Sequence, residues 1–219
     1  MKPGSLLETL VLVARSPGTG AARPRLAKEL GEAEAERMQA AFLVDAVTLA
    51  AQWTQRVEDG GQRQVALYIS DAVDDPLVLE MAALCHGRVR VPSGHDVGEQ
   101  LHRALQDELD RGAHRVLAVF PHAPSLPVHL VEEGFRAALF HDAVVGPSFD
   151  GGAWAVGLRR DPEGDSAREA ALLTALLDKQ PWDTHGLLQG IMDKTHKAGF
   201  HTHWLPFWMD AAAMPQSDV

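Results

Sequence analysis

Cysteine is almost absent from this chain, since Cys85 is the only one among 219 residues. A single cysteine excludes an intrachain disulfide and any zinc site built from cysteine ligands. Basic residues are also few, because 20 Lys and Arg against 30 Asp and Glu give a formal net charge of −10. This charge argues against non-specific binding to nucleic acid, which requires a basic face.

Long apolar runs are missing as well, and none approaches the roughly 18–20 residues that span a bilayer. The stretch MKPGSLLETLVLVARSPG at residues 1–18 carries one Lys, is interrupted by Glu8 and Thr9, and lacks a small-residue cleavage site. It therefore predicts a first β-strand and not a signal peptide. From these absences we expect a cytoplasmic protein with no membrane span.

The chain does contain a regular alternation of short apolar runs with amphipathic segments. Strands are predicted at residues 7–15, 63–70, 87–91, 114–120, 142–148, 151–160 and 200–207, and helices at residues 32–57, 74–87, 96–112, 127–140, 166–179 and 185–199. This alternation predicts an α/β fold with three αβα layers and a mostly parallel sheet. We expect a single domain over residues 1–210 and a loose tail at 211–219. Ligands of such folds bind beyond the carboxyl ends of the strands.

The loop after the first predicted strand is rich in arginine and glycine. Arg15, Arg23 and Arg25 stand in a stretch, residues 9–28, that contains no acidic residue. Gly20 allows the backbone to approach a ligand closely, and guanidinium groups match the geometry of phosphate. The loop predicts a diphosphate cradle, with a solvated basic loop as the alternative. It contains neither the dinucleotide-binding fingerprint nor a Walker motif.

Five motifs in chain order carry a resemblance. RSPGTGAARPRL at residues 15–26 is similar to Lys-x-Pro-x-x-Gly-x-x-Lys-Thr-Arg-Leu, and DVGEQL, GPSFDGGAWAVGL, PWDT and LPFWMD follow from residues 96, 146, 181 and 205. On these motifs the chain resembles the bacterial family of small GT-A-type glycosyltransferase-like proteins, mostly uncharacterised and related to nucleotide-diphospho-sugar transferases. The resemblance implies a GT-A-like fold, a nucleotide or nucleotide sugar as partner, and Mn²⁺ or Mg²⁺ as cofactor.

Two acids of the family pattern are replaced. Where the family has Gly-x-Asp-x-Pro-x-Leu-Pro, this chain has FPHAPSLP at residues 120–127, so His122 takes the place of an acid that the resemblance assigns to metal and sugar-nucleotide binding. Near the end, Asp-x-Asp-Thr becomes DAAA, which puts Ala212 in place of the second acid. Asp150 and Asp210 remain as candidate oxygen ligands. Histidine is a poor ligand for Mg²⁺ but can join a Mn²⁺ site. The cofactor we expect is Mn²⁺ or Mg²⁺, and the alternative is that the protein binds no metal.

The candidate nucleotide- or phosphate-binding residues are Arg15, Gly20, Arg23, Arg25, Asp96, His122 and Asp150, and no catalytic residue is predicted. Two of them have a structural alternative. Asp96 suits the N-cap of a helix, which is the interpretation its position favours, and Asp150 suits an Asp-Gly-Gly turn. His201 and His203, two apart on a predicted strand, would share one face and suit a zinc pair if a third ligand came from elsewhere.

The sequence leaves more than one function open, including whether the protein is an enzyme. We expect a glycosyltransferase-like protein that binds a nucleotide or nucleotide sugar through a degenerate metal site, with weak or no transferase activity. The alternative is an active, metal-dependent glycosyl- or nucleotidyltransferase that uses a nucleotide sugar. A zinc-assisted hydrolase built on histidines is a third hypothesis.

Overall fold

The computed structural model of this protein describes residues 6–16, 27–28, 31–56, 61–70, 74–182 and 184–209. The strands in this part of the chain are β1 (Leu7–Arg15), β2 (Gln62–Ser70), β3 (Arg88–Arg90), β4 (Arg115–Val119), β5 (Ala143–Pro147), β6 (Ala153–Arg159) and β7 (Thr202–Trp204). The helices are α2 (Glu32–Gln55), α3 (Pro76–Leu84), α4 (Val97–Asp110), α5 (Val128–Ala137), α6 (Ser166–Leu177) and α7 (Leu187–Lys197). Every predicted strand and helix is present, most within two residues of its predicted ends.

The strands form one mixed sheet in the order β3-β2-β1-β4-β6-β5-β7. Neighbours pair in parallel except at β6, which runs antiparallel to both β4 and β5. β1 lies near the middle, and its residues Leu10, Val11 and Leu12 are fully buried. A nearly continuous apolar run is typical of a strand that is covered on both faces.

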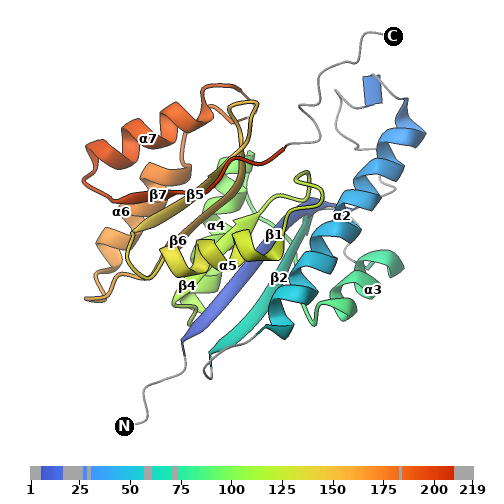
Figure 1. Cartoon of the computed structure of the whole chain (residues 1–219), viewed down its shortest axis with the longest axis horizontal. Coiled ribbons are helices and arrows are strands. Elements are labelled where there is room, and N and C mark those ends of the chain that lie inside the picture. Colours follow the sequence, from blue (N-terminus) through green and yellow to red (C-terminus); the bar gives the residue numbers. More distant parts are fainter. Residues whose placement is uncertain are drawn as a thin grey trace.

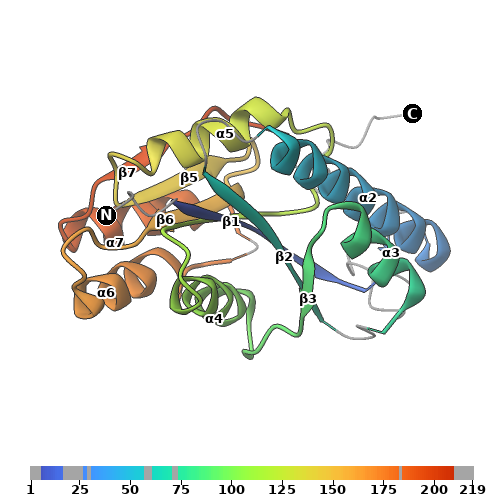
Figure 2. The ribbon, with the colours of Figure 1, turned by 90° about the horizontal axis from the view of Figure 1, so that it is seen from below.

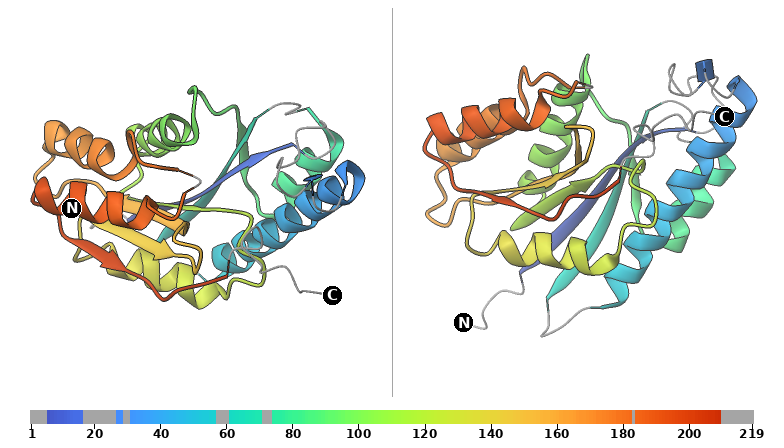
Figure 3. Two further views of the ribbon diagram at one scale, coloured as in Figure 1. Left: turned by 90° about the horizontal axis from the view of Figure 1, so that it is seen from above. Right: turned by 45° about the horizontal axis from the view of Figure 1, so that its top comes forward.

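Helices cover both faces of the sheet. α2, α3 and α5 lie on one face, and α4, α6 and α7 lie on the other (Figures 1 and 2). α6 and α7 lie side by side over one end of the sheet, while α2 and α3 lie over the other end (Figure 3). The predicted three-layer αβα class with a mostly parallel sheet is therefore confirmed.

Local sequence explains where several helices begin. Asp75, Asp96 and Asp165 each accept a hydrogen bond from a backbone N–H in the first turn of the helix that follows. Such caps satisfy N–H groups that have no partner within the helix. None of the helices in the described ranges combines the length and the apolar character that crossing a bilayer requires.

The reversed strand β6 brings several loops to the same edge of the sheet. Val119 at the end of β4 pairs with Ala155, and Pro147 at the end of β5 pairs with Ala153, the first residue of β6. β7 is parallel to β5, so the chain also leaves β7 at this edge. The segments after β1, β4, β5 and β7 therefore meet at one side, which is called the carboxyl edge below.

Candidate functional site

The loop after β4 holds His122 against an aromatic floor. Its ring stacks on Phe120, with 5.4 Å between centroids and 20° between planes. Phe120 in turn makes an edge-to-face contact with Trp182, at 6.2 Å. The backbone N–H of Phe120 donates to the carbonyl oxygen of Trp154 on β6, at 2.9 Å. His122 is half-buried, and its position follows from this packing rather than from the loop alone.

Trp182 also contacts the first turn of α4. Its indole Nε1 donates to the carbonyl oxygen of Leu177 at 3.1 Å, and a Cβ atom at Gly98 would lie only 2.5 Å from that nitrogen. Asp96 caps α4 by accepting from the Glu99 N–H at 2.8 Å, while the Glu99 carboxylate accepts from the His95 N–H at 3.0 Å. The structure thus gives Asp96 the helix-capping role that its position favoured. Nucleotide binding by Asp96 remains a prediction.

The Asp-Gly-Gly turn after β5 is fixed by its own side chains. Asp150 Oδ1 accepts from the Ser148 hydroxyl at 2.7 Å and from the Gly152 N–H at 3.0 Å. The ring Nδ1 of His185, which comes just before α7, contacts the Asp150 carbonyl oxygen. The structure thus gives Asp150 a turn role, at the carboxyl edge next to the segment that follows Trp182. Nucleotide and metal binding by Asp150 remain predictions.

Trp208 joins three of these loops. Its indole Nε1 donates to the carbonyl oxygen of Pro124 at 3.1 Å, and its backbone N–H donates to the carbonyl oxygen of Pro147 at 3.0 Å. Its own carbonyl oxygen accepts from the Phe149 N–H at 3.3 Å. The motifs FPHAP, GPSFDGG and LPFW, far apart in the sequence, are thus in direct contact in the fold.

The arginine loop is only partly described. Arg15 ends β1 with an exposed side chain, and its carbonyl oxygen accepts from Gln39 Nε2 at 3.3 Å. Gly20, Arg23, Arg25 and the candidate ligand Asp210 lie outside the described residues. The expectation that the three arginines converge near Asp150 therefore stays a prediction.

A Mg²⁺ or Mn²⁺ site needs several oxygen ligands close together. Within the described ranges, no group of three His, Cys, Asp or Glu side chains could hold a metal ion. The described residues by themselves therefore do not fit such a site. The same finding means that His201 and His203 have no third zinc ligand among the described residues. The His203 ring instead packs on the ring of His141, with 4.9 Å between centroids.

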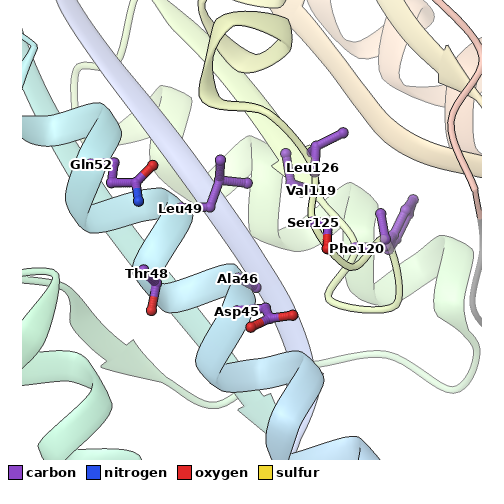
Figure 4. Close-up of a pocket in the computed structure, with 10 residues that line it drawn as sticks. Asp45, Ala46, Thr48, Leu49, Gln52, Val119, Phe120, Ser125 and Leu126 are labelled. Atoms are coloured by element: carbon purple, nitrogen blue, oxygen red, sulfur yellow. The ribbon is translucent and has the colours of Figure 1, made fainter.

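A small cavity of about 200 Å³ lies between α2 and the loop after β4 (Figure 4). Apolar residues such as Leu49 and Leu126 line it together with polar ones, and Asp45 is the charged residue among the described residues of its lining. A carboxylate without a cation among these described residues does not suit a diphosphate, so the carboxyl edge is the better candidate site.

A second cavity, of about 460 Å³, lies beside α4 and includes Tyr68 in its lining. The Tyr68 hydroxyl lies 3.1 Å from Glu108, which is fully buried and pairs with Arg90 at 3.0 Å. Burial together with the neighbouring carboxylates raises the pKa of Tyr68 above its ordinary value. The sequence signal for this buried network was an acid on the apolar stripe of α4, one position before Leu109.

Sequence reasoning also missed the roles of Trp182, His185 and Trp208. Two of them belong to motifs that carried the resemblance, PWDT and LPFWMD, but neither motif indicated what its tryptophan touches. Only the spatial arrangement shows that these side chains support the loops that carry His122 and Asp150.

A family model described as "Uncharacterized protein conserved in bacteria (DUF2064)" matches residues 53–184 of the chain. No curated protein matches the chain significantly. Among solved structures, it is similar to a protein assigned as a nucleotide-diphospho-sugar transferase from Desulfovibrio desulfuricans G20, with 22% identity and a TM-score of 0.72, over 93% of this chain and 81% of that one.

Two further structures are similar at lower identity. 4-Diphosphocytidyl-2C-methyl-D-erythritol synthase from Anaerococcus prevotii DSM 20548 has 10% identity and a TM-score of 0.56, over 92% of this chain and 89% of that one. Glucosyl-3-phosphoglycerate synthase from Mycobacterium tuberculosis, solved with Mn²⁺, UDP and glucosyl-3-phosphoglycerate, has 14% identity and a TM-score of 0.55, over 94% and 72%. These likenesses establish the fold and confirm the predicted GT-A-like architecture.

Proposed function

The chain belongs to the bacterial family of uncharacterised proteins DUF2064, and for this member we propose a function. It binds a nucleoside diphosphate or nucleotide sugar at the carboxyl edge of its sheet, and its transferase activity is weak or absent. The observation that carries the proposal is the stacking of His122 on Phe120, which itself contacts Trp182, at the end of a buried strand. A similar fold, glucosyl-3-phosphoglycerate synthase, was solved with UDP and Mn²⁺.

The chemistry of a diphosphate explains why activity is proposed to be weak. Transfer requires that the charge of the departing diphosphate be neutralised, which a divalent ion does by bridging its oxygens. At position 122, where the resemblance expects a carboxylate, this chain has an imidazole, which is a cation when protonated. As a cation, His122 contacts a phosphate directly, and Arg15, Arg23 and Arg25 add positive charge. Fixed cations preserve binding, but they do not bridge the leaving group.

Calorimetric titration tests the binding. UDP, GDP, CDP, ADP, dTDP and their sugar conjugates are titrated with and without Mn²⁺, and we expect one base to bind without metal. Arg25→Glu abolishes this binding. The control Arg136→Glu does not, because Arg136 is an exposed residue of the last turn of α5. The neighbouring Phe135 carbonyl oxygen accepts from Arg115 at the start of β4, the end of that strand opposite the carboxyl edge. Absence of binding by the whole panel would contradict the proposal.

A reversion tests the inactivity. The double variant His122→Asp with Ala212→Asp restores both acids of the family pattern. We expect it to hydrolyse a nucleotide sugar in the presence of Mn²⁺, while neither single variant does so. Robust metal-dependent turnover by the unmodified protein would overturn the proposal in favour of an active transferase.

A further inference from the structure

Two phenylalanine rings stand exposed beside the candidate site. Phe149 is 70% exposed and Phe207 is 54% exposed. The rings stack on each other, with 5.5 Å between centroids and 25° between planes, although they come from different segments, one after β5 and one after β7. Phe149 directly precedes Asp150 in the chain. This pair is called the aromatic pair below.

The backbone that carries the aromatic pair is held in place. The Phe149 N–H donates to the carbonyl oxygen of Trp208, the neighbour of Phe207, and the Trp208 indole is bonded to Pro124 in the loop that carries His122. Both rings therefore sit on segments that hydrogen bonds fix to the carboxyl edge. Two large apolar rings left in water on a fixed backbone, next to a candidate site, indicate a surface that a ligand covers.

No other exposed aromatic ring is available at the turn between β5 and β6. Trp154 on β6 is fully buried, where its Nε1 donates to the carbonyl oxygen of Pro206, and the preceding residue is Ala153. The aromatic pair thus offers the apolar ring surface at this turn.

We propose that the aromatic pair formed by Phe149 and Phe207 is a sugar-binding subsite, on which the C–H face of a pyranose ring stacks. This inference rests on the proposed function, because it extends the nucleotide site toward a sugar. The faces of aromatic rings carry partial negative charge, which attracts the weakly positive C–H groups of a sugar ring. Sugar hydroxyls need acceptors, and the carboxylate of Asp150 follows Phe149 directly. The turn that carries Phe149 therefore supplies an apolar surface and, in the next residue, a carboxylate whose Oδ1 also accepts from Ser148 and Gly152.

The test compares each sugar nucleotide with its own nucleoside diphosphate. For UDP-glucose against UDP, and the corresponding GDP, CDP, ADP and dTDP pairs, Phe149→Ala and Phe207→Ala are expected to weaken the sugar conjugate about fivefold and to leave the diphosphate unchanged. Phe149→Tyr keeps the aromatic face and retains binding. The matched control is Phe140→Ala, which removes a 75% exposed ring that follows α5.

A second titration decides whether the sugar is part of the nucleotide or a free acceptor. Methyl glucoside is added to the protein in the presence of saturating diphosphate, and its binding is monitored by NMR. Binding that depends on Phe149 and Phe207 in this arm alone assigns the subsite to a free acceptor sugar. An equal loss for diphosphate and sugar conjugate, or no dependence on the aromatic pair in either arm, overturns the inference. If the unmodified protein binds no nucleotide, the proposed function fails. The subsite is then tested with methyl glucoside alone. NMR shifts that depend on Phe149 and Phe207 support the subsite, and their absence rejects it.

Discussion

Asp142 is a buried carboxylate at the point where the chain enters β5. It accepts from the His201 N–H at 3.0 Å and pairs with Arg168 at 3.1 Å and Arg159 at 3.4 Å. Burial alone raises the pKa of Asp142, but the His201 N–H and the Arg168 guanidinium stabilise the ionised form and bring the pKa below its usual value. A depressed folded-state pKa stabilises the fold above the unfolded-state pKa of about 3.9, and this stabilisation is lost as the pH falls through the folded-state pKa.

The variant Asp142→Asn isolates this contribution. At pH 7 we expect its free energy of unfolding to fall by about 1–3 kcal/mol, because two arginines lose an ionised partner. Below about pH 4 the difference from the unmodified protein narrows, since the Asp142 carboxylate of the unfolded chain binds a proton at a higher pH than that of the folded protein. Urea unfolding at a series of pH values measures both effects. A difference that stays constant from pH 7 to pH 3 would contradict the linkage, and Asp193→Asn, at an exposed position of α7, serves as control.

Single residues also mark the limit of sequence reasoning. The capping role of Asp96 could be predicted from its position, and His122 stands where the resemblance expects an acid. The contact of Phe120 with Trp182 could not be predicted, because it joins the end of β4 to a segment some 60 residues later. Glu108 was unpredicted for the same reason: its partners Arg90 and Tyr68 lie on strands whose order in the sheet the sequence did not define.

At the scale of an element, the Asp-Gly-Gly turn depends on Gly151 for two reasons. Its φ of +85° favours glycine, and a Cβ atom there would lie 2.6 Å from the carbonyl oxygen of His185. Gly164, with φ of +75°, has nothing within 4 Å of such an atom. Both Ala variants therefore carry the strain of a left-handed backbone, about 1 kcal/mol, but only Gly151→Ala carries the clash as well.

We accordingly expect Gly151→Ala to lower the free energy of unfolding by at least about 1 kcal/mol more than Gly164→Ala. The clash also pushes the turn away from His185, so nucleotide-sugar binding weakens in the first variant and not in the second. Denaturant unfolding and calorimetry measure the two effects. Equal destabilisation by both substitutions would show that the contact between the turn and His185 is absent.

Helix α4 gives the test of Asp96. Asparagine caps helices about as well as aspartate, whereas alanine costs about 1 kcal/mol. If Asp96 only caps, Asp96→Asn retains both stability and nucleotide affinity, and Asp96→Ala loses stability to the same extent as Asp165→Ala, its counterpart at α6. A loss of affinity in Asp96→Asn at unchanged thermal stability would instead support the predicted nucleotide contact.

The elements themselves were the most predictable level. The pattern of apolar residues and the Asp caps located the strands and helices, because both signals depend on residues that are close together in the sequence. The antiparallel direction of β6 was not predictable in the same way, since it depends on the strands with which β6 pairs, β4 and β5. β7 is shorter than its predicted range, 202–204 against 200–207, because it pairs with β5 through three residues only.

At the scale of the whole molecule, the single-domain prediction has a direct test. Both helical layers pack on one sheet, with Trp53 of α2 buried on one face and Trp182 on the opposite face near α4. We expect one cooperative thermal transition, with the same midpoint by far-ultraviolet circular dichroism and by tryptophan fluorescence. Trp53→Phe and Trp182→Phe each remove the fluorescence of one layer's tryptophan from a signal that the other four tryptophans share. If the thermal midpoint measured by fluorescence differs from the midpoint measured by circular dichroism in these variants, the chain contains two independently folding units.

The place of β1 between β2 and β4 has a consequence during synthesis. β4 begins at Arg115, so a nascent chain that has not reached this residue leaves one edge of β1 unpaired, with the apolar residues Leu10, Val11 and Leu12 along it. An unpaired apolar edge readily pairs with strands of other chains. At roughly 5–20 residues per second, the ribosome needs several seconds to translate from the end of β2 to β4. During that interval this edge of β1 stays open to pairing with strands of other chains.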